Sequence, residues 1–167
     1  MESCDLLDHV ARNDERAFGR LYERFADRIF RYALTLLRNR HLAEEVVQET
    51  MIAIWKNAES FGGRSQVSTW IFGIARNQAY TLLRREVAGE RRSVEKLFLP
   101  DPAEEVEREE QVRAAMSALP VGQREVVFLA FYEGLSYGEI ARILAVPEGT
   151  VKSRMYHAKQ KLAGALT

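Results

Sequence analysis

Apolar residues recur every three or four positions along residues 17–37, and this spacing limits what the segment can become. The period collects apolar side chains on one face of an α-helix, whereas a strand would need alternation at every second position. The stripe consists of Phe18, Leu21, Tyr22, Phe25, Ile29, Phe30, Ala33, Leu34 and Leu37. Because no segment of the chain alternates over a useful length, we expect an all-α fold.

The same period returns in residues 42–55 and again in residues 70–82. Paired glycines mark the intervening residues 60–65 as a loop, and Ser68 is expected to cap the helix that follows this loop. We therefore assign residues 1–86 to a first small helical domain.

Residues 87–110 break the helical pattern. They contain two prolines and turn from basic to strongly acidic, which predicts a flexible linker between two domains. A new helix is expected to start near Glu104, and a further apolar run covers residues 124–133. Together with the stretch 135–162, these helices predict a second, four-helix domain over residues 111–167.

The stretch 135–162 has the pattern of two short helices joined by a tight turn. Ser136 and Glu139 have the spacing of a capping box, which starts the first helix, and Pro147 separates it from the second. The second helix is expected to bury Val151, Met155, Ala158 and Leu162 and to present Thr150, Lys152, Ser153, Arg154, Tyr156, His157, Lys159 and Lys161. This basic, hydrogen-bonding face favours a DNA-binding helix-turn-helix over a helical hairpin with a solvated surface.

Positive charge is concentrated in two parts of a chain whose net charge is zero. Lys and Arg outnumber Asp and Glu by 7 to 3 in residues 61–96 and by 5 to 2 in residues 135–167, whereas residues 97–113 carry 2 against 6. Local potential attracts a polyanion even where the net charge is zero. Both basic parts are therefore candidate nucleic-acid surfaces.

Two helices of the first domain carry polar faces that periodicity alone leaves ambiguous. The acidic face of residues 42–55 fits a solvated surface, which we favour from the period alone, or a docking surface. The third helix ends in Arg84-Arg85 and interleaves amide, hydroxyl and aromatic groups, as in proteins that bind single-stranded nucleic acid. The alternative is that Trp70 and Tyr80 belong to the core and that the arginines interact with the helix dipole. For Trp70 we favour the core.

Several other classes of protein do not fit the sequence. The single Cys4 cannot form an internal disulfide, and the three histidines are too scattered for a structural zinc site. No apolar run approaches a membrane-spanning length, and the first residues lack the parts of a signal peptide. We expect a cytoplasmic protein without membrane insertion, cofactor, metal or small-molecule substrate. No nucleophile with its base and no carboxylate pair is discernible, so we do not expect an enzyme.

Three segments carry a family resemblance in this order: LAEEVVQETMIAIWK, SFGGRSQVSTWIFGIARNQAYTLLRR and ALPVGQREVVFLAFYEGLSYGEIARILAVPEGTVKSRMYHAKQKL. Together they resemble the extracytoplasmic-function sigma factors of bacterial RNA polymerase, over about residues 17–166. The resemblance implies two helical domains, called sigma region two and sigma region four, and a role in promoter-specific transcription initiation.

The resemblance also implies three binding surfaces. Core RNA polymerase is contacted by the second helix, at positions that match Glu44, Glu45, Gln48, Glu49 and Trp55, which reverses our preference for a solvated face. The minus-ten promoter element is read as a melted strand with a flipped base, at positions that match Phe61, Arg64, Asn77 and Tyr80, and Arg76, Arg84 and Arg85 are expected to hold its backbone. The minus-thirty-five element is read in the major groove by Gly149, Thr150, Lys152, Ser153, Arg154, Tyr156 and His157, with Lys152 or Arg154 expected at a guanine edge.

The partners implied by the family are core RNA polymerase, through its beta-prime coiled coil and beta flap, promoter DNA and an anti-sigma factor that covers both domains. His157 departs from the arginine of many relatives and would make a weaker, pH-dependent phosphate contact. Two other classes are left open by the residues alone. One is a stand-alone helix-turn-helix regulator that uses residues 17–86 for dimerisation or sensing. The other is a recombinase-like enzyme, for which we cannot assemble a catalytic cluster.

Overall fold

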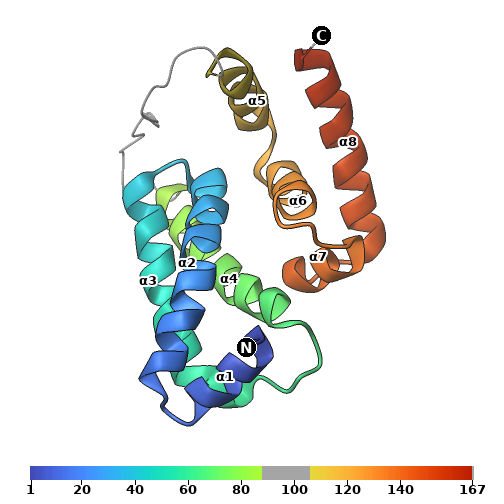
Figure 1. The fold of residues 1–167 in the computed structure, drawn as a ribbon. Coiled ribbons are helices and arrows are strands. Elements are labelled where there is room, and N and C mark those ends of the chain that lie inside the picture. Colours follow the sequence, from blue (N-terminus) through green and yellow to red (C-terminus); the bar gives the residue numbers. More distant parts are fainter. Residues whose placement is uncertain (88–105, 167) are drawn as a thin grey trace.

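The computed structural model describes residues 1–87 and 106–166, and all regular elements in these ranges are helices. In chain order they are α1 (Ser3–Ala11), α2 (Glu15–Leu37), α3 (Arg40–Asn57), the 3-10 helix η1 (Ala58–Ser60), α4 (Val67–Val87), α5 (Val106–Ala118), α6 (Val121–Phe131), α7 (Tyr137–Leu144) and α8 (Glu148–Leu166). The all-α prediction and the two helical domains are confirmed (Figure 1). Most of the predicted linker, residues 88–105, lies outside the described residues, and its last part, from Val106, belongs to α5.

Helices α1 to α4 form the first domain. The apolar stripe of α2 buries Leu21, Phe25 and Ile29, each no more than 2% exposed, against α3 and α4. The Asp14 side chain caps α2 by accepting hydrogen bonds from the backbone N–H groups of Arg16 and Ala17. The apolar face of α2 therefore forms the centre of the first domain, as the spacing predicts, but Tyr22, which the period places on this face, is 44% exposed.

Helix α1 was missed by the sequence analysis. Its buried residues Leu6, Leu7 and Val10 have helical spacing and pack mainly against α2. A helix of 9 residues contains too few turns for its apolar period to repeat, which is why the pattern gave no clear signal.

Local backbone and side-chain interactions determine where α2 ends and α3 begins. Arg38 ends α2 in the left-handed conformation, with φ of 53°, and the Asn39 side chain accepts a hydrogen bond from the Leu42 N–H at 3.0 Å to start α3. The prediction that Ser68 caps the third helix is wrong. Helix α4 begins at Val67, so Ser68 lies inside its first turn.

Helices α5 to α8 form the second domain, in which α7 and α8 are the predicted helix-turn-helix. The capping box is present: the Glu139 N–H donates to Ser136 Oγ at 3.1 Å, and the Ser136 N–H donates to Glu139 Oε2 at 3.0 Å. Ala145 ends α7 in the left-handed conformation, and α8 begins directly after Pro147. Val151, Met155 and Ala158 are buried as predicted, whereas Leu162 is only half-buried.

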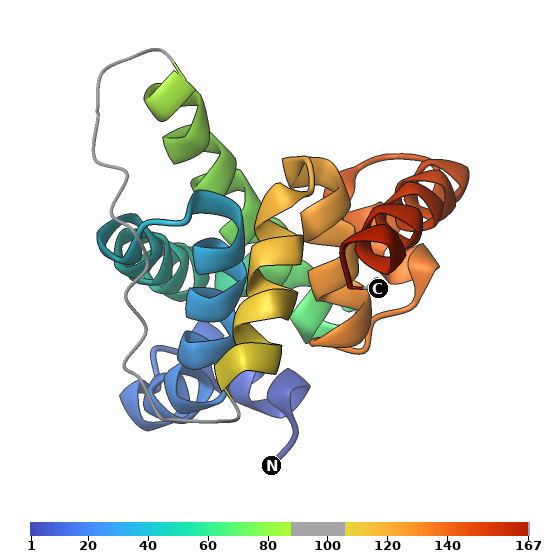
Figure 2. The same cartoon turned by 90° about the horizontal axis from the view of Figure 1, so that it is seen from above.

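The two domains pack directly against each other, with α6 on α2 and α7 on α4. The Tyr32 ring of α2 lies 5.4 Å from the Phe72 ring of α4 and 5.9 Å from the Phe128 ring of α6, and all three side chains are buried. Figure 2 shows α8 on the side of the second domain remote from α3. The domain seam, meaning the contact of α6 and α7 with α2 and α4, is a feature that the sequence analysis did not predict.

We predict that Ser136→Ala lowers the free energy of unfolding by about 1 kcal/mol, because it removes the acceptor of the capping box. Ser68→Ala is the matched control, since Ser68 does not cap a helix, and it should lower stability by less than about 0.5 kcal/mol. Urea unfolding followed by circular dichroism measures both variants. Equal effects of the two substitutions would contradict the helix boundaries described above.

Candidate functional site

Three surfaces contain the residues that the sequence analysis singled out, and the first is the outer face of α3. Glu44, Gln48 and Glu49 are exposed there and Glu45 is half-buried. Trp55 is half-buried at the far end of the helix, where the Phe18 ring of α2 meets it edge-on at 5.3 Å. These five predicted polymerase-contact residues therefore lie along one helix, with carboxylates at one end and an aromatic pair at the other.

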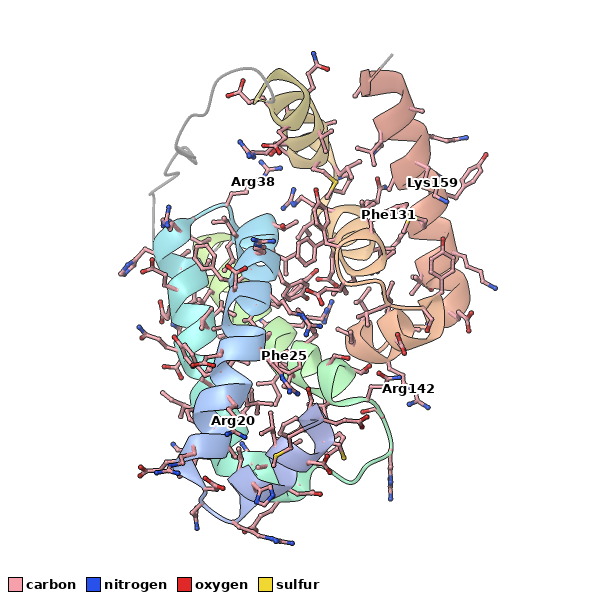
Figure 3. All side chains as sticks on the ribbon, viewed as in Figure 1. Arg20, Phe25, Arg38, Phe131, Arg142 and Lys159 are labelled. Atoms are coloured by element: carbon pink, nitrogen blue, oxygen red, sulfur yellow. The ribbon has the colours of Figure 1, made fainter. Side chains whose placement is uncertain are left out.

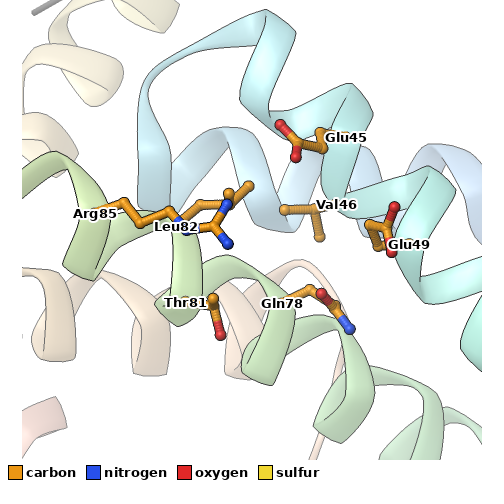
Figure 4. A pocket seen from close by; sticks show the side chains of 7 residues that line it. All are labelled: Glu45, Val46, Glu49, Gln78, Thr81, Leu82 and Arg85. Atoms are coloured by element: carbon orange, nitrogen blue, oxygen red, sulfur yellow. The ribbon is translucent and has the colours of Figure 1, made fainter. Parts of the chain in front are cut away.

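A groove separates this acidic face from α4. It has a volume of about 270 Å³ and is lined by Glu45, Val46, Glu49, Gln78, Thr81, Leu82 and Arg85. Figure 4 shows the Arg85 side chain extending from α4 across the groove toward α3. The predicted polymerase surface and the predicted minus-ten surface therefore share an edge along this groove.

The second surface follows α4 and the loop before it. Asn77, Arg84 and Arg85 are exposed on the helix, and Arg64 is exposed in the loop. Phe61 is half-buried, because its ring lies 5.5 Å from the Trp70 ring. Trp70 is itself half-buried and packs against the core, which agrees with the core interpretation that we preferred for it.

Arg76 and Tyr80, which belong to the same predicted surface, are half-buried and lie against other side chains. The Arg76 Nε donates to Glu125 Oε1 at 2.9 Å, and its guanidinium carbon lies 4.1 Å from the centre of the Tyr80 ring. The Tyr32 hydroxyl donates to the other oxygen, Glu125 Oε2, at 3.3 Å. Glu125 belongs to α6 and its side chain is 0% exposed. The Glu125 carboxylate of the second domain therefore forms a salt bridge with an arginine of the first domain.

This cluster shifts the pKa of both tyrosines upward. Burial, reinforced by the neighbouring Glu125 carboxylate, raises the pKa of Tyr32 well above its ordinary value and that of Tyr80 to about 12. Neither tyrosine can become phenolate next to that carboxylate at ordinary pH. Both hydroxyls therefore remain protonated, and Tyr32 remains a hydrogen-bond donor to Glu125.

Three further contacts hold the domain seam closed. Arg28 of α2 donates to Glu133 Oε2 at 2.9 and 2.6 Å through its Nε and one Nη atom. Arg124 of α6 donates to the backbone carbonyls of Thr35 and Leu36, at the C-terminal end of α2, where cations are favoured. Burial and the charge of Arg38 lower the pKa of Arg124 to about 10.

The third seam contact reaches the loop that precedes α4. Arg142 of α7 donates to the backbone carbonyl of Arg64 at 3.0 Å, and Figure 3 shows Arg142 at the edge of α7 that faces this loop. The helix-turn-helix therefore touches the predicted minus-ten surface through its first helix.

The third surface is the outer side of α8. Lys152, Ser153, Tyr156 and His157 are exposed, and the Lys152 Nζ lies 3.8 Å from a carboxylate oxygen of Glu148 one turn earlier. Gly149 is exposed and Thr150 is half-buried at the start of the helix. Most of the predicted minus-thirty-five residues therefore face solvent on one side of one helix.

Arg154 differs from these neighbours. It is half-buried, and a Cβ built on Gly122 of α6 would lie 3.6 Å from its guanidinium carbon. The guanidinium therefore lies against the backbone of α6. This position makes Lys152 a better candidate than Arg154 for reading a base edge.

Comparison with known families identifies both domains. Residues 21–88 match the family model described as sigma-70 region 2, and residues 109–162 match the model described as sigma-70 region 4. Relatives include the ECF RNA polymerase sigma factor SigK of Mycobacterium tuberculosis, 32% identical over 171 residues, which cover 96% of this chain and 91% of SigK. SigM of the same species is 35% identical over 162 residues, covering 96% of this chain and 82% of SigM. The chain belongs to the ECF sigma factors of the sigma-70 family.

Two solved structures share the arrangement of helices. The structure of CnrH in complex with the cytosolic domain of CnrY has a TM-score of 0.76 at 26% identity and covers 98% of this chain and 96% of that one. RpoE of Bartonella quintana, in complex with the anti-sigma factor NepR, has a TM-score of 0.76 at 25% identity and covers 89% of this chain and 96% of that one. The high coverage means that both domains of this chain match in each comparison.

The described residues contain neither a cluster of metal ligands nor a membrane-spanning helix. In residues 1–87 and 106–166, no group of three or more His, Cys, Asp or Glu side chains could hold a metal ion. Within the same part of the chain, no helix is both long and apolar enough to cross a membrane.

We predict an alkaline loss of stability that depends on Tyr80. The ordinary pKa of tyrosine is 10.0 and that of folded Tyr80 is about 12, so above pH 10 the unfolded chain releases a proton that the folded chain retains. The free energy of unfolding should therefore fall between about pH 10 and pH 12, and it should fall less in Tyr80→Phe. Urea unfolding at a series of pH values measures the slope, with Tyr22→Phe as the control at an exposed tyrosine. Equal slopes for the wild type and Tyr80→Phe would contradict the prediction.

Proposed function

We propose that this sigma factor brings core RNA polymerase to a small set of promoters, using α3 for the polymerase, α4 with its preceding loop for the minus-ten element and α8 for the minus-thirty-five element. The observation that carries the proposal is the match of residues 21–88 and 109–162 to sigma regions 2 and 4. Each proposed contact surface lies inside one of these two matched segments. The polymerase carries the bond-making chemistry, so the chain itself acts as an initiation factor and not as an enzyme.

The exposed face of α3 suits the beta-prime coiled coil. Its carboxylates and Gln48 can accept or donate hydrogen bonds to a partner helix, and Ile52, at 46% exposure, adds apolar area next to them. A polar rim beside an apolar patch is the usual composition of a protein interface. This supports a docking surface over a merely solvated face.

The exposed part of α4 suits an opened DNA strand. Asn77 offers an amide to a base edge, and Arg84 and Arg85 lie further along the helix, where they can follow the backbone. Phe61 lies in the loop beside the helix, where an aromatic ring can line a pocket for a flipped base. The melted minus-ten element is therefore the proposed ligand of this surface.

The exposed part of α8 suits duplex DNA. Lys152 and Ser153 follow the start of the helix, which is where a recognition helix reaches base edges, while Tyr156 and His157 lie one turn further on. We propose Lys152 as the reader of a guanine edge and Arg154 as a side chain that fixes α8 against α6. The second domain also offers the surface for the beta flap of the polymerase.

An anti-sigma factor is the proposed regulator of this cytoplasmic protein. Support comes from the relatives: the RpoE structure that matches both domains was solved with an anti-sigma factor. A protein that covers both domains at once would block polymerase and promoter together.

Run-off transcription with core RNA polymerase tests the proposal. The full chain should stimulate initiation from specific promoters, and no stimulation on any promoter of its genome would refute the function. Protection of a palindromic duplex by the protein alone would instead favour a stand-alone helix-turn-helix regulator.

We predict that the double variant Gln48→Ala/Glu49→Ala weakens binding to core polymerase by about tenfold or more, because it removes two exposed polar contacts from the centre of the α3 face. Promoter preference should be unchanged, since α4 and α8 are intact. Fluorescence anisotropy of the labelled protein with core enzyme measures the affinity. Glu23→Gln, a change at an exposed position of α2, is the control, and unaltered affinity of the double variant would restore the solvated-face interpretation.

We also predict that Lys152→Ala removes about 1–3 kcal/mol of discrimination between the minus-thirty-five element and a scrambled sequence, because a base contact is lost. Arg154→Ala should remove less, since its guanidinium lies against Gly122. Run-off transcription from matched and scrambled promoters with each holoenzyme measures the two variants. An equal loss on both promoters would identify Lys152 as a phosphate contact.

A further inference from the structure

We propose that Glu125 is an intramolecular competitor of promoter DNA: its carboxylate occupies Arg76 in place of a backbone phosphate and holds the free protein in a closed, non-binding state. This inference rests on the proposed role of α4 at the minus-ten element. It adds a regulatory contact that needs no second protein.

The geometry of the cluster is that of a filled anion site. The Glu125 carboxylate accepts from the Arg76 guanidinium on one oxygen and from the Tyr32 hydroxyl on the other, at 2.9 and 3.3 Å. The Glu125 side chain is 0% exposed and that of Arg76 is 21% exposed. Guanidinium groups bind carboxylates and phosphates through the same N–H donors. A phosphate that binds through the Arg76 Nε must therefore displace Glu125.

The pairing also depends on how the two domains pack. Glu125 belongs to α6, which packs on α2, and Arg76 belongs to α4, which packs on α7. Separation of the two domains is therefore the step that removes Glu125 from Arg76.

A buried ion pair is suited to switching between two such states. Its net contribution to stability is small, because desolvation offsets the attraction, but removal of one partner leaves the other charge buried and unpaired. When the domain seam opens, water hydrates both Glu125 and Arg76. A DNA phosphate can then bind the Arg76 guanidinium. The Arg28–Glu133 pair at the same seam separates in the same way. Its desolvation in the closed state is smaller than that of the Arg76–Glu125 pair, because Arg28 is 38% exposed.

Such a closed state lowers the apparent affinity for DNA by the fraction of molecules that are open. If about one molecule in ten or one in a hundred is open, the apparent dissociation constant rises about tenfold or a hundredfold. A substitution that opens the seam removes this factor without adding any contact to DNA.

The test uses the full-length protein without polymerase. We expect Glu125→Gln to increase the radius of gyration in small-angle X-ray scattering and to tighten binding to a short single-stranded DNA of mixed sequence by about tenfold. Glu110→Gln is the matched control, because it makes the same charge change at an exposed position of α5 away from the seam. The control should stay compact and bind as the wild type does.

A third variant separates competition from simple opening. Glu125→Gln combined with Arg76→Ala should be as open as Glu125→Gln but should lose the gain in DNA affinity. If the double variant keeps the whole gain, Arg76 is not the group for which carboxylate and phosphate compete, and the proposal is wrong. If Glu125→Gln unfolds, as seen by circular dichroism, Glu125→Asp is used, because the shorter carboxylate keeps the charge but cannot reach Arg76 and Tyr32 together.

The outcome distinguishes this proposal from the function on which it rests. A Glu125 variant that stays compact, with unchanged DNA affinity, overturns the competitor while run-off transcription still succeeds. Failure of run-off transcription overturns the sigma-factor role, and neither scattering nor mixed-sequence binding depends on that assay.

Discussion

The carboxylate of Glu125 is buried in the domain seam. The packing of the two domains depends on the hydrogen bonds that this carboxylate accepts there. It is surrounded by an aromatic core in which Tyr32, Phe72 and Phe128 contact one another across the seam. A carboxylate in such a place is stable only with donors on both oxygens, and Arg76 and Tyr32 supply them. These donors come from α4 and α2, so the contact fixes α6 against two helices of the first domain.

The seam combines this polar centre with apolar area, and the two parts act differently when the domains separate. The intact Glu125–Arg76 pair adds little net stability to the closed state, because both groups are hydrated in the open one, but loss of either partner leaves the other charge buried and unpaired and disfavours closure. Phe128 is 4% exposed and Tyr32 and Phe72 are 0% exposed, and water disfavours their exposure at about 25 cal/mol per Å². The aromatic residues therefore favour the closed state. The Glu125–Arg76 pair determines which anion competes for the arginine. A partner that binds only the open state has to compensate for the exposed aromatic area.

Much of the fold could be predicted because local signals were strong. The period of α2, the capping box at Ser136 and the turn before Pro147 each depend on residues within a few positions of one another, and all three were found as expected. Helix α1 escaped because 9 residues contain too little periodicity. The helix start at Ser68 was predicted wrongly, because an N-cap pattern fits several neighbouring positions. Only the backbone conformation determines which residue starts the helix.

The site was predicted less completely, for a different physical reason. Exposure of Asn77, Lys152 and Gln48 follows from helical period alone, and all three are exposed. Arg76 has the same period and the same basic character, yet its partner is Glu125, 49 positions away in the sequence. Charge patterns identify which residues can bind a phosphate, but they do not reveal which acidic side chain reaches the arginine first. In this chain that acid is carried by α6 of the second domain, so the exposure of Arg76 depends on the position of that whole domain.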